Sequence, residues 1–249
     1  MLEVLYCEWR KMRKSAAFGV TISLALLCPI LFFLIKISDM DFKALKDRSL
    51  LNWTDYLENE KIISILIAGL LVIAIVSSYA WVREHGDNTL NVLFTYPVHR
   101  LTIITAKLIL IALFLLGYNL IDTIISHVLI MIVKGEWIPG HNLIDNLMNG
   151  FISYLFQVAL VPLFFLIGMI SRNIIVPIAT SIIFMFVLLY LVETSYLDSL
   201  PFGGPIFPFM WYDDSTSGLS MFQMIWENGI LMVVCLAVIV YQTLRSEVR

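Results

Sequence analysis

The chain has 249 residues, of which 60% are hydrophobic and only 14% are charged. A soluble domain is nearer half apolar and a quarter charged, so this composition excludes an ordinary soluble protein and predicts an integral membrane protein. The net charge of −3 by itself says nothing about partners, and no nucleic-acid partner is expected. The three cysteines and four histidines show no CxxC or HExxH spacing, so the sequence predicts neither a disulfide framework nor a metal site.

The first fifteen residues are basic and amphipathic. Their apolar residues recur at helical spacing, at Leu2, Leu5, Trp9 and Met12. Cations gather toward the end of the same segment. This pattern predicts an interfacial helix over residues 1–15, with its apolar face in the inner leaflet and its cations near the phosphates. The alternative is a charged tail that only sets the orientation of the chain.

Six apolar runs follow, and a helix needs about 20 residues to cross the hydrocarbon core. They cover residues 16–35, 62–82, 101–133, 151–170, 174–192 and 225–244. The third run is longer than one crossing requires, which predicts a strong tilt or a projection into the cytosol. The sequence therefore predicts an all-α membrane protein with six transmembrane helices in a single domain, residues 1–249.

The distribution of Lys and Arg predicts the orientation. With the N-terminus inside, 10 of the 16 cations fall in cytosolic segments, and four of them directly precede the first span. These ten are Arg10, Lys11, Arg13, Lys14, Arg83, Arg100, Lys107, Arg172, Arg245 and Arg249. Most acidic residues then lie outside. Both termini are therefore predicted to be cytoplasmic.

The last outer segment, residues 193–224, contains neither Lys nor Arg and is rich in aromatic residues, proline and glycine. This composition is typical of a segment that dips into the outer leaflet or lies on it. Trp211 within it is a candidate contact for a substrate, or a member of an interfacial aromatic belt.

The longest polar connection on the predicted cytoplasmic side is the loop 83–100. Residues 86–88, Gly-Asp-Asn, predict a turn and a cap for a helix that begins at Thr89. An apolar face then forms at i, i+3, i+4 spacing from Leu90, Leu93 and Phe94. Pro97 ends the segment. This short amphipathic helix can dock in a groove of another protein or pack on the protein's own spans.

Several residues of this loop resemble the cytosolic loop of ABC-2 type permeases, the membrane subunits of one class of ATP-binding-cassette exporter. The matching residues are Glu84, Thr89, Leu90, Leu93, Pro97, Arg100 and Lys107. The chain departs from the pattern at Asp87 and Asn88, where many members place Gly before the Thr-Leu pair. The resemblance extends to the length, the six spans, the N-terminal helix and the long outer segment. Among these permeases, a small chain resembles those of bacterial bacitracin and lantibiotic self-protection systems.

The resemblance implies a division of labour. Two permease chains would form a homodimeric pathway in the bacterial cell membrane, in contact with lipid, and separate cytosolic ATPase subunits would bind ATP and Mg. This chain would bind no cofactor, and it has no GxxxxGK[ST] phosphate loop. The residues that would couple it to the ATPase are Glu84, Thr89, Leu90, Leu93, Phe94, Pro97 and Arg100. The expected task is removal of a peptide antibiotic from the membrane.

Polar residues of the third span are candidates for the substrate pathway. Asn119, Asp122 and Ser126 recur at three- and four-residue spacing, so they share one face of the predicted helix. A carboxylate at membrane depth is a functional candidate because its burial is costly. The alternatives are that Asp122 is structural, or that it is solvated near the outer interface.

Other functions are compatible with the same pattern. The same machinery could export another hydrophobic compound, a lipid or a polymer. A chain of a different class would be a membrane sensor, an assembly subunit or a membrane enzyme. No spacing of a nucleophile and a base indicates an enzyme.

Overall fold

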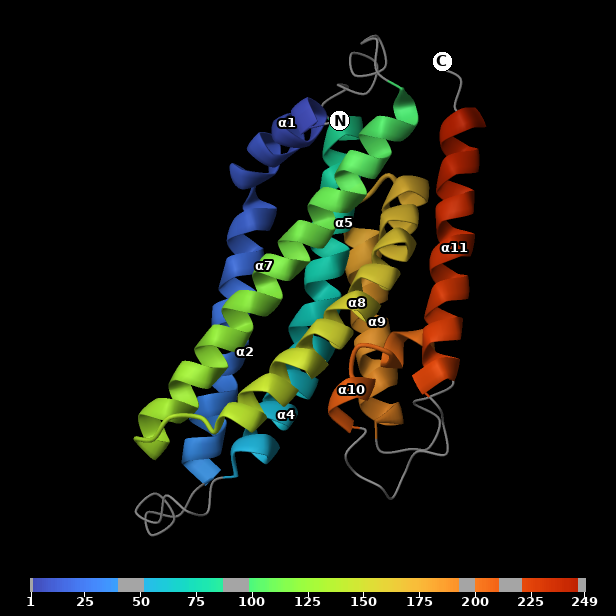
Figure 1. Ribbon diagram of the computed structural model, residues 1–249. Coiled ribbons are helices and arrows are strands. Elements are labelled where there is room, and N and C mark those ends of the chain that lie inside the picture. Colours follow the sequence, from blue (N-terminus) through green and yellow to red (C-terminus); the bar gives the residue numbers. More distant parts are fainter. Residues whose placement is uncertain (1, 40–51, 87–98, 193–199, 211–220, 246–249) are drawn as a thin grey trace.

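The computed structural model describes residues 2–39, 52–86, 99–192, 200–210 and 221–245, and every regular element within these ranges is helical (Figure 1). The elements are α1 (Leu2–Arg13), α2 (Ala16–Asp39), α4 (Trp53–Ser64), the π-helical turn η2 (Ile65–Gly69), α5 (Leu70–Gly86), α7 (Arg100–Lys134), α8 (Gly140–Ser171), α9 (Ile175–Leu191), the 3-10 turn η4 (Pro201–Gly203), α10 (Phe207–Met210) and α11 (Met221–Arg245).

Five helices of the described chain are long and apolar enough to cross a membrane. They are α2, the continuous helix Trp53–Glu84, α7, α8 and α11, and the apolar α9 is shorter, with 17 residues. Five of the predicted apolar runs lie within one of these helices, and the run 174–192 extends one residue beyond α9 at each end. With 35 residues, α7 is about 52 Å long, against a hydrocarbon core of about 30 Å. It runs obliquely across the bundle (Figure 1).

Two helices begin many residues earlier than the hydrophobic runs indicate. α4 begins at Trp53 rather than Ile62, and α8 begins at Gly140 rather than Phe151. In α4 the reason is that Glu60 and Lys61, which interrupt the apolar run, are buried inside the bundle. From the sequence alone, a charged side chain that is buried in the protein is easily assigned to a loop.

The helix Trp53–Glu84 forms the centre of the bundle. Within it, 67% of the most apolar window is buried, against 22% for α2 and for α11. α5 packs against α2, α7, α8 and α9. It approaches α8 closely at Gly168, where an added Cβ would lie 3.2 Å from the Cα of Ser78. Small residues at such crossings allow two helix backbones to come close together in a membrane protein.

The described part of the predicted outer aromatic segment packs inside the molecule. Ile206, Phe207 and Phe209 are buried, and the Oγ of Ser153 on α8 donates a hydrogen bond to the carbonyl oxygen of Pro205 at 2.6 Å. The ring of Phe202 also stacks on a ring of α9, with centroids 4.0 Å apart. Residues 200–210 thus fill the space between α4, α8, α9 and α11. Trp211 lies outside the described residues.

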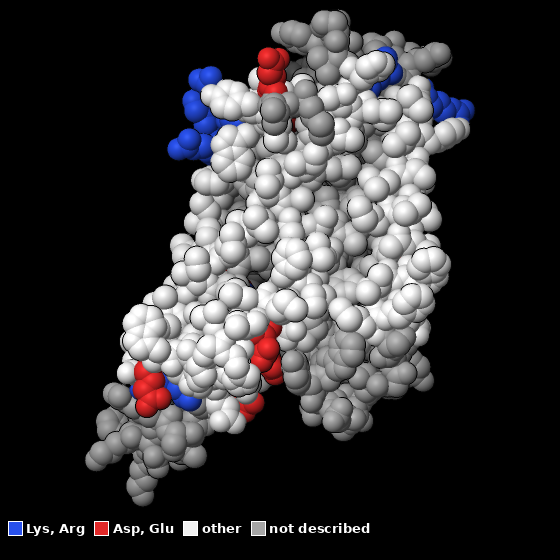
Figure 2. All heavy atoms as spheres, viewed as in Figure 1, with Lys and Arg blue, Asp and Glu red and all other residues white. Residues whose placement is uncertain are grey.

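Charged side chains are concentrated at the two ends of the molecule. Figure 2 shows Lys, Arg, Asp and Glu near the end that carries α1 and near the opposite end, with an uncharged band between them on this face. The α1 end also holds the C-terminal end of α11 (Figure 1). This band suits the apolar interior of a bilayer.

Candidate functional site

The predicted coupling loop is described only at its two flanks. Thr89, Leu90, Leu93, Phe94 and Pro97 lie outside the described residues. Glu84 belongs to the end of α5, and Arg100 is the first residue of α7, preceded by His99 as the N-cap. The site at this end of the molecule is therefore built from the residues on which the loop is anchored.

Four charged residues form what we term the α1-end cluster: Glu8, Lys11, Glu84 and Lys107. Lys107 is only 1% exposed, and its Nζ lies 2.7 Å from Oε2 of Glu8 and 2.9 Å from Oε1 of Glu84. It also donates to the carbonyl oxygen of Ala80 at 2.9 Å. The Nζ of Lys11 lies 3.0 Å from each of the two glutamates. The cluster therefore joins α1, α5 and α7 through buried ion pairs.

The electrostatics of this cluster favour its ionised form. Burial alone would raise the pKa of Glu8, but the charge of Lys107 and hydrogen bonds from both lysines outweigh it, so the pKa of Glu8 is lowered. Burial likewise opposes the charge of Lys11, but its bonds and charge interactions with Glu8 and Glu84 raise its pKa. Two carboxylates and two ammonium groups balance, which a buried cluster requires.

A second buried group, which we term the α4–α7 cluster, consists of Glu60, Lys61, Ser64, Tyr118, Asp122 and Ser126. Asp122 is 1% exposed; it forms an ion pair with Lys61 and accepts a hydrogen bond from the Oγ of Ser64 at 2.7 Å. The hydroxyl groups of Ser64 and Tyr118 are 2.8 Å apart. Ser126 donates to the carbonyl oxygen of Asp122 at 2.7 Å. The π-helical turn η2 follows this cluster directly, and such turns often lie at functional sites.

Asn119 belongs to a different environment from the other two predicted pathway residues of α7. Its Nδ2 donates to the side-chain oxygen of Gln157 on α8 at 2.9 Å. Asp122 and Ser126 are both buried in the α4–α7 cluster. The structure therefore brings Asp122 and Ser126 together in one cluster. Asn119 lies outside this cluster, because its side chain contacts α8.

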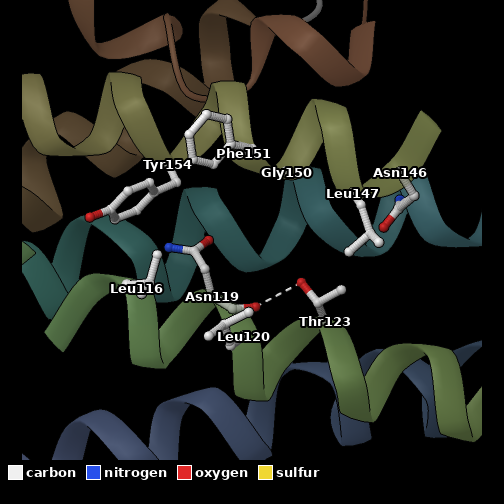
Figure 3. Close-up of a pocket in the computed structure, with 9 residues that line it drawn as sticks. All are labelled: Leu116, Asn119, Leu120, Thr123, Asn146, Leu147, Gly150, Phe151 and Tyr154. Carbon is white, nitrogen blue, oxygen red and sulfur yellow. Dashed lines mark hydrogen bonds between the residues drawn. The ribbon is translucent and has the colours of Figure 1, made fainter. Parts of the chain in front are cut away.

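Asn119 lines a pocket of about 200 Å³ between α7 and α8 (Figure 3). Its walls are Leu116, Asn119, Leu120, Thr123, Asn146, Leu147, Gly150, Phe151 and Tyr154. Leu120, Leu147 and Phe151 are all exposed, so the pocket opens on the apolar flank of the bundle. The Oδ1 of Asn146 is buried without a hydrogen-bond partner among the described residues. The pocket thus offers mainly apolar walls and, at Asn146, an acceptor oxygen that no described residue occupies.

Comparison with known proteins identifies the family to which this architecture belongs. The family model described as "ABC-2 family transporter protein" matches residues 4–189. The chain belongs to the ABC-2 transporter family. Both clusters and the pocket lie within the matched residues, so they are parts of the membrane component of a transporter.

One curated relative of this permease is the bacitracin transport permease protein BCRB of Bacillus licheniformis. The two chains are 24% identical over 137 residues, which is 55% of this permease and 66% of the relative, just under two thirds of its length. No solved structure matches the permease.

The sequence analysis of the permease singled out some members of the two clusters and missed others. Glu84 and Lys107 were found through the loop pattern, although their contact with each other was not. Glu8, Lys61 and Glu60 were missed as site residues. A signal was present for Lys61 and Lys107, because a lone cation within or beside an apolar run needs a buried carboxylate when it faces the protein interior.

Proposed function

We propose that this permease is the membrane-spanning subunit of an ATP-binding-cassette exporter that removes a peptide antibiotic, of the bacitracin or lantibiotic type, from the membrane. The relative named as a bacitracin transport permease supports the substrate class. The pocket between α7 and α8 supports access from the lipid side, because its opening lies among exposed apolar residues.

The α1-end cluster is the observation that carries the proposal. Glu84 lies three residues before the part of the loop that follows α5, and Lys107 lies on the first turns of α7. Glu84 pairs with Lys107, and α1 contacts both residues: its Glu8 pairs with Lys107 and its Lys11 pairs with Glu84. These contacts join both flanks of the loop to α1. A force applied to the loop by a cytosolic ATPase would therefore act on α1, α5 and α7 as one unit.

The ATPase subunit, its ATP and Mg, and a second copy of the permease complete the proposed machine. Thr89, Leu90, Leu93, Phe94, Pro97 and Arg100 form the proposed contact with the ATPase, together with Glu84 as an anchor. Transmission requires the loop to bind the ATPase differently in its two nucleotide states, since equal affinity for both states would move nothing.

A direct test replaces Leu93 and Phe94 together with Asp. The double variant should lose peptide-antibiotic resistance and substrate-stimulated ATPase activity while it reaches normal membrane levels, because it removes the apolar face of the predicted loop helix. The matched control is Asn91→Asp, which adds a carboxylate to the polar side of the same segment and should leave both activities near the wild-type level. Survival of both activities in the double variant would refute the coupling role.

A further inference from the structure

Glu60 is a buried carboxyl group that the ion pair beside it does not neutralise. Its side chain is 1% exposed, and neither oxygen accepts a hydrogen bond from the described residues. Its carboxyl group lies close to the carboxyl group of Asp122, to Lys61 and to the hydroxyl group of Ser126. Lys61 is already bound to Asp122, and the hydroxyl proton of Ser126 is donated to a backbone carbonyl at 2.7 Å. Glu60 thus lacks the donors that an ionised carboxylate needs.

The charges of the α4–α7 cluster do not balance if every group is ionised. It contains the two carboxyl groups of Glu60 and Asp122 against the single ammonium group of Lys61, whereas the α1-end cluster has two of each. An excess negative charge in a membrane-spanning helix is costly. The cluster therefore needs one more positive charge, which a proton or a bound cation could supply.

Among the described residues, the other titratable groups that face Glu60 do not supply this charge. Cys28 of α2, Tyr56 of α4 and Tyr118 of α7 can only be neutral or negative. The Nδ1 of His127 lies 2.7 Å from the carbonyl oxygen of Thr123, and its Nε2 has no partner among the described residues, which suits a neutral ring.

The described side chains of the other residues packed against α4 show no further cation bound to Glu60. Lys134 of α7 lies over the ring of Trp53, at the start of α4. On α8, His141 and Asp145 are exposed and lie 3.8 Å from each other. On α2, Lys36 is exposed and lies over the ring of Phe32. The sequences of η2 and α10 contain no titratable residue.

A proton fits the site better than a metal ion does. Within the described ranges no group of three or more His, Cys, Asp or Glu side chains is placed to hold a metal, and hard cations need several oxygen ligands. Two carboxyl groups in contact cannot both ionise, so one of them keeps a proton. We propose that Glu60 holds a proton at neutral pH and donates it as a hydrogen bond to Asp122, so that the α4–α7 cluster is a proton-binding site.

This site makes the contact between α4 and α7 dependent on one proton. Asp122 then accepts hydrogen bonds from Lys61, Ser64 and Glu60, which satisfies a fully buried carboxylate. Loss of the proton would place two carboxylates against each other and drive the two helices apart beside the π-helical turn η2.

The test counts protons on the purified full-length permease. The permease, purified in a mild detergent, is unfolded by adding a denaturing detergent at pH 7 in weakly buffered solution. An indicator dye measures the protons that are released. In the unfolded chain Glu60 is ionised, so the wild type should release about one proton per chain more than Glu60→Gln. The folded wild type should also show the infrared carbonyl band of a protonated carboxyl group, and Glu60→Gln should lose it.

Two further variants separate this site from other sources of a proton. In Asp122→Asn, Glu60 becomes the sole carboxylate beside Lys61 and should ionise, so both the band and the extra proton should disappear. Asp55→Asn removes an exposed carboxylate of the same helix and should behave like the wild type. The proposal is overturned if the wild type shows no band, if Glu60→Gln keeps the extra proton, or if sodium or potassium ions abolish the band.

Discussion

At the scale of single residues, Lys107 is the most deeply buried member of the α1-end cluster. It touches a carboxylate of α1, a carboxylate of α5 and a backbone carbonyl, and water does not reach it. Lys11 serves the same two glutamates from a side chain that is 45% exposed. The two lysines therefore make a natural pair for comparing a buried and an exposed cation in one network.

Replacement of Lys107 with Met should detach α1 from the bundle. Removing one partner of a buried ion pair costs about 3–5 kcal/mol, because the remaining charge stays buried. Lys11→Met should cost less than Lys107→Met, since the Lys11 side chain is 45% exposed and solvent screens its charge, although both of its partners are buried. Denaturation midpoints of the two purified variants check this prediction, and equal losses in both would contradict it.

The pH dependence of stability should reflect the lowered pKa of Glu8. A carboxyl group whose folded pKa lies below its ordinary value of 4.5 stabilises the fold fully above that value. The contribution disappears as the pH falls through the lowered folded pKa. Glu8→Gln should therefore lose less stability than the wild type between pH 7 and about pH 3. Thermal unfolding at the two pH values measures the difference, and a loss as large as that of the wild type would refute it.

At the scale of elements, the close crossing of α5 and α8 depends on one glycine. An added Cβ at Gly168 would lie 3.2 Å from the Cα of Ser78, which is backbone and cannot rotate away. At Gly117 in α7, which is also within a long helix, an added Cβ meets nothing within 4 Å. The two positions differ in packing although both are helical.

Gly168→Ala should destabilise the permease, because α5 and α8 must separate to admit the methyl group. Gly117→Ala should be neutral or should stabilise the protein by up to about 1 kcal/mol, since alanine has the higher helix propensity. Unfolding midpoints of both variants in detergent check the contrast. A stabilised Gly168→Ala variant would show that the helices can move apart without loss.

At the scale of the whole molecule, the pocket between α7 and α8 provides a test of transport. An added Cβ at Gly150 meets no atom within 4 Å, and the residue lines the pocket, so Gly150→Phe should fill it without disturbing the backbone. Gly19 on α2 is equally open but does not line this pocket.

Gly150→Phe should reduce antibiotic resistance several-fold, while the variant still reaches the membrane at the normal level. Gly19→Phe should leave resistance unchanged. Growth in graded concentrations of bacitracin and of a lantibiotic measures both effects. Full resistance in the Gly150→Phe variant would show that the substrate does not use this pocket.

Much of the arrangement of helices was predictable from the sequence. Each of the six apolar runs corresponds to a helix, and the bounds of the third and fifth runs differ from those of α7 and α9 by one residue at each end. The starts of α4 and α8 were predicted too late. In α4 this happened because a hydropathy pattern counts Glu60 and Lys61 as exposed, although both side chains are buried inside the bundle.

The sequence by itself determined that the protein is helical, resides in a membrane and resembles ABC-2 permeases, because these properties depend on the local hydrophobicity of each segment and on one short loop pattern. Only the tertiary structure decided which charges neutralise one another. Glu8 binds Lys107, and Lys61 binds Asp122, across long separations in the chain. Such pairs form only when folding brings their helices together, and no period in the sequence encodes them.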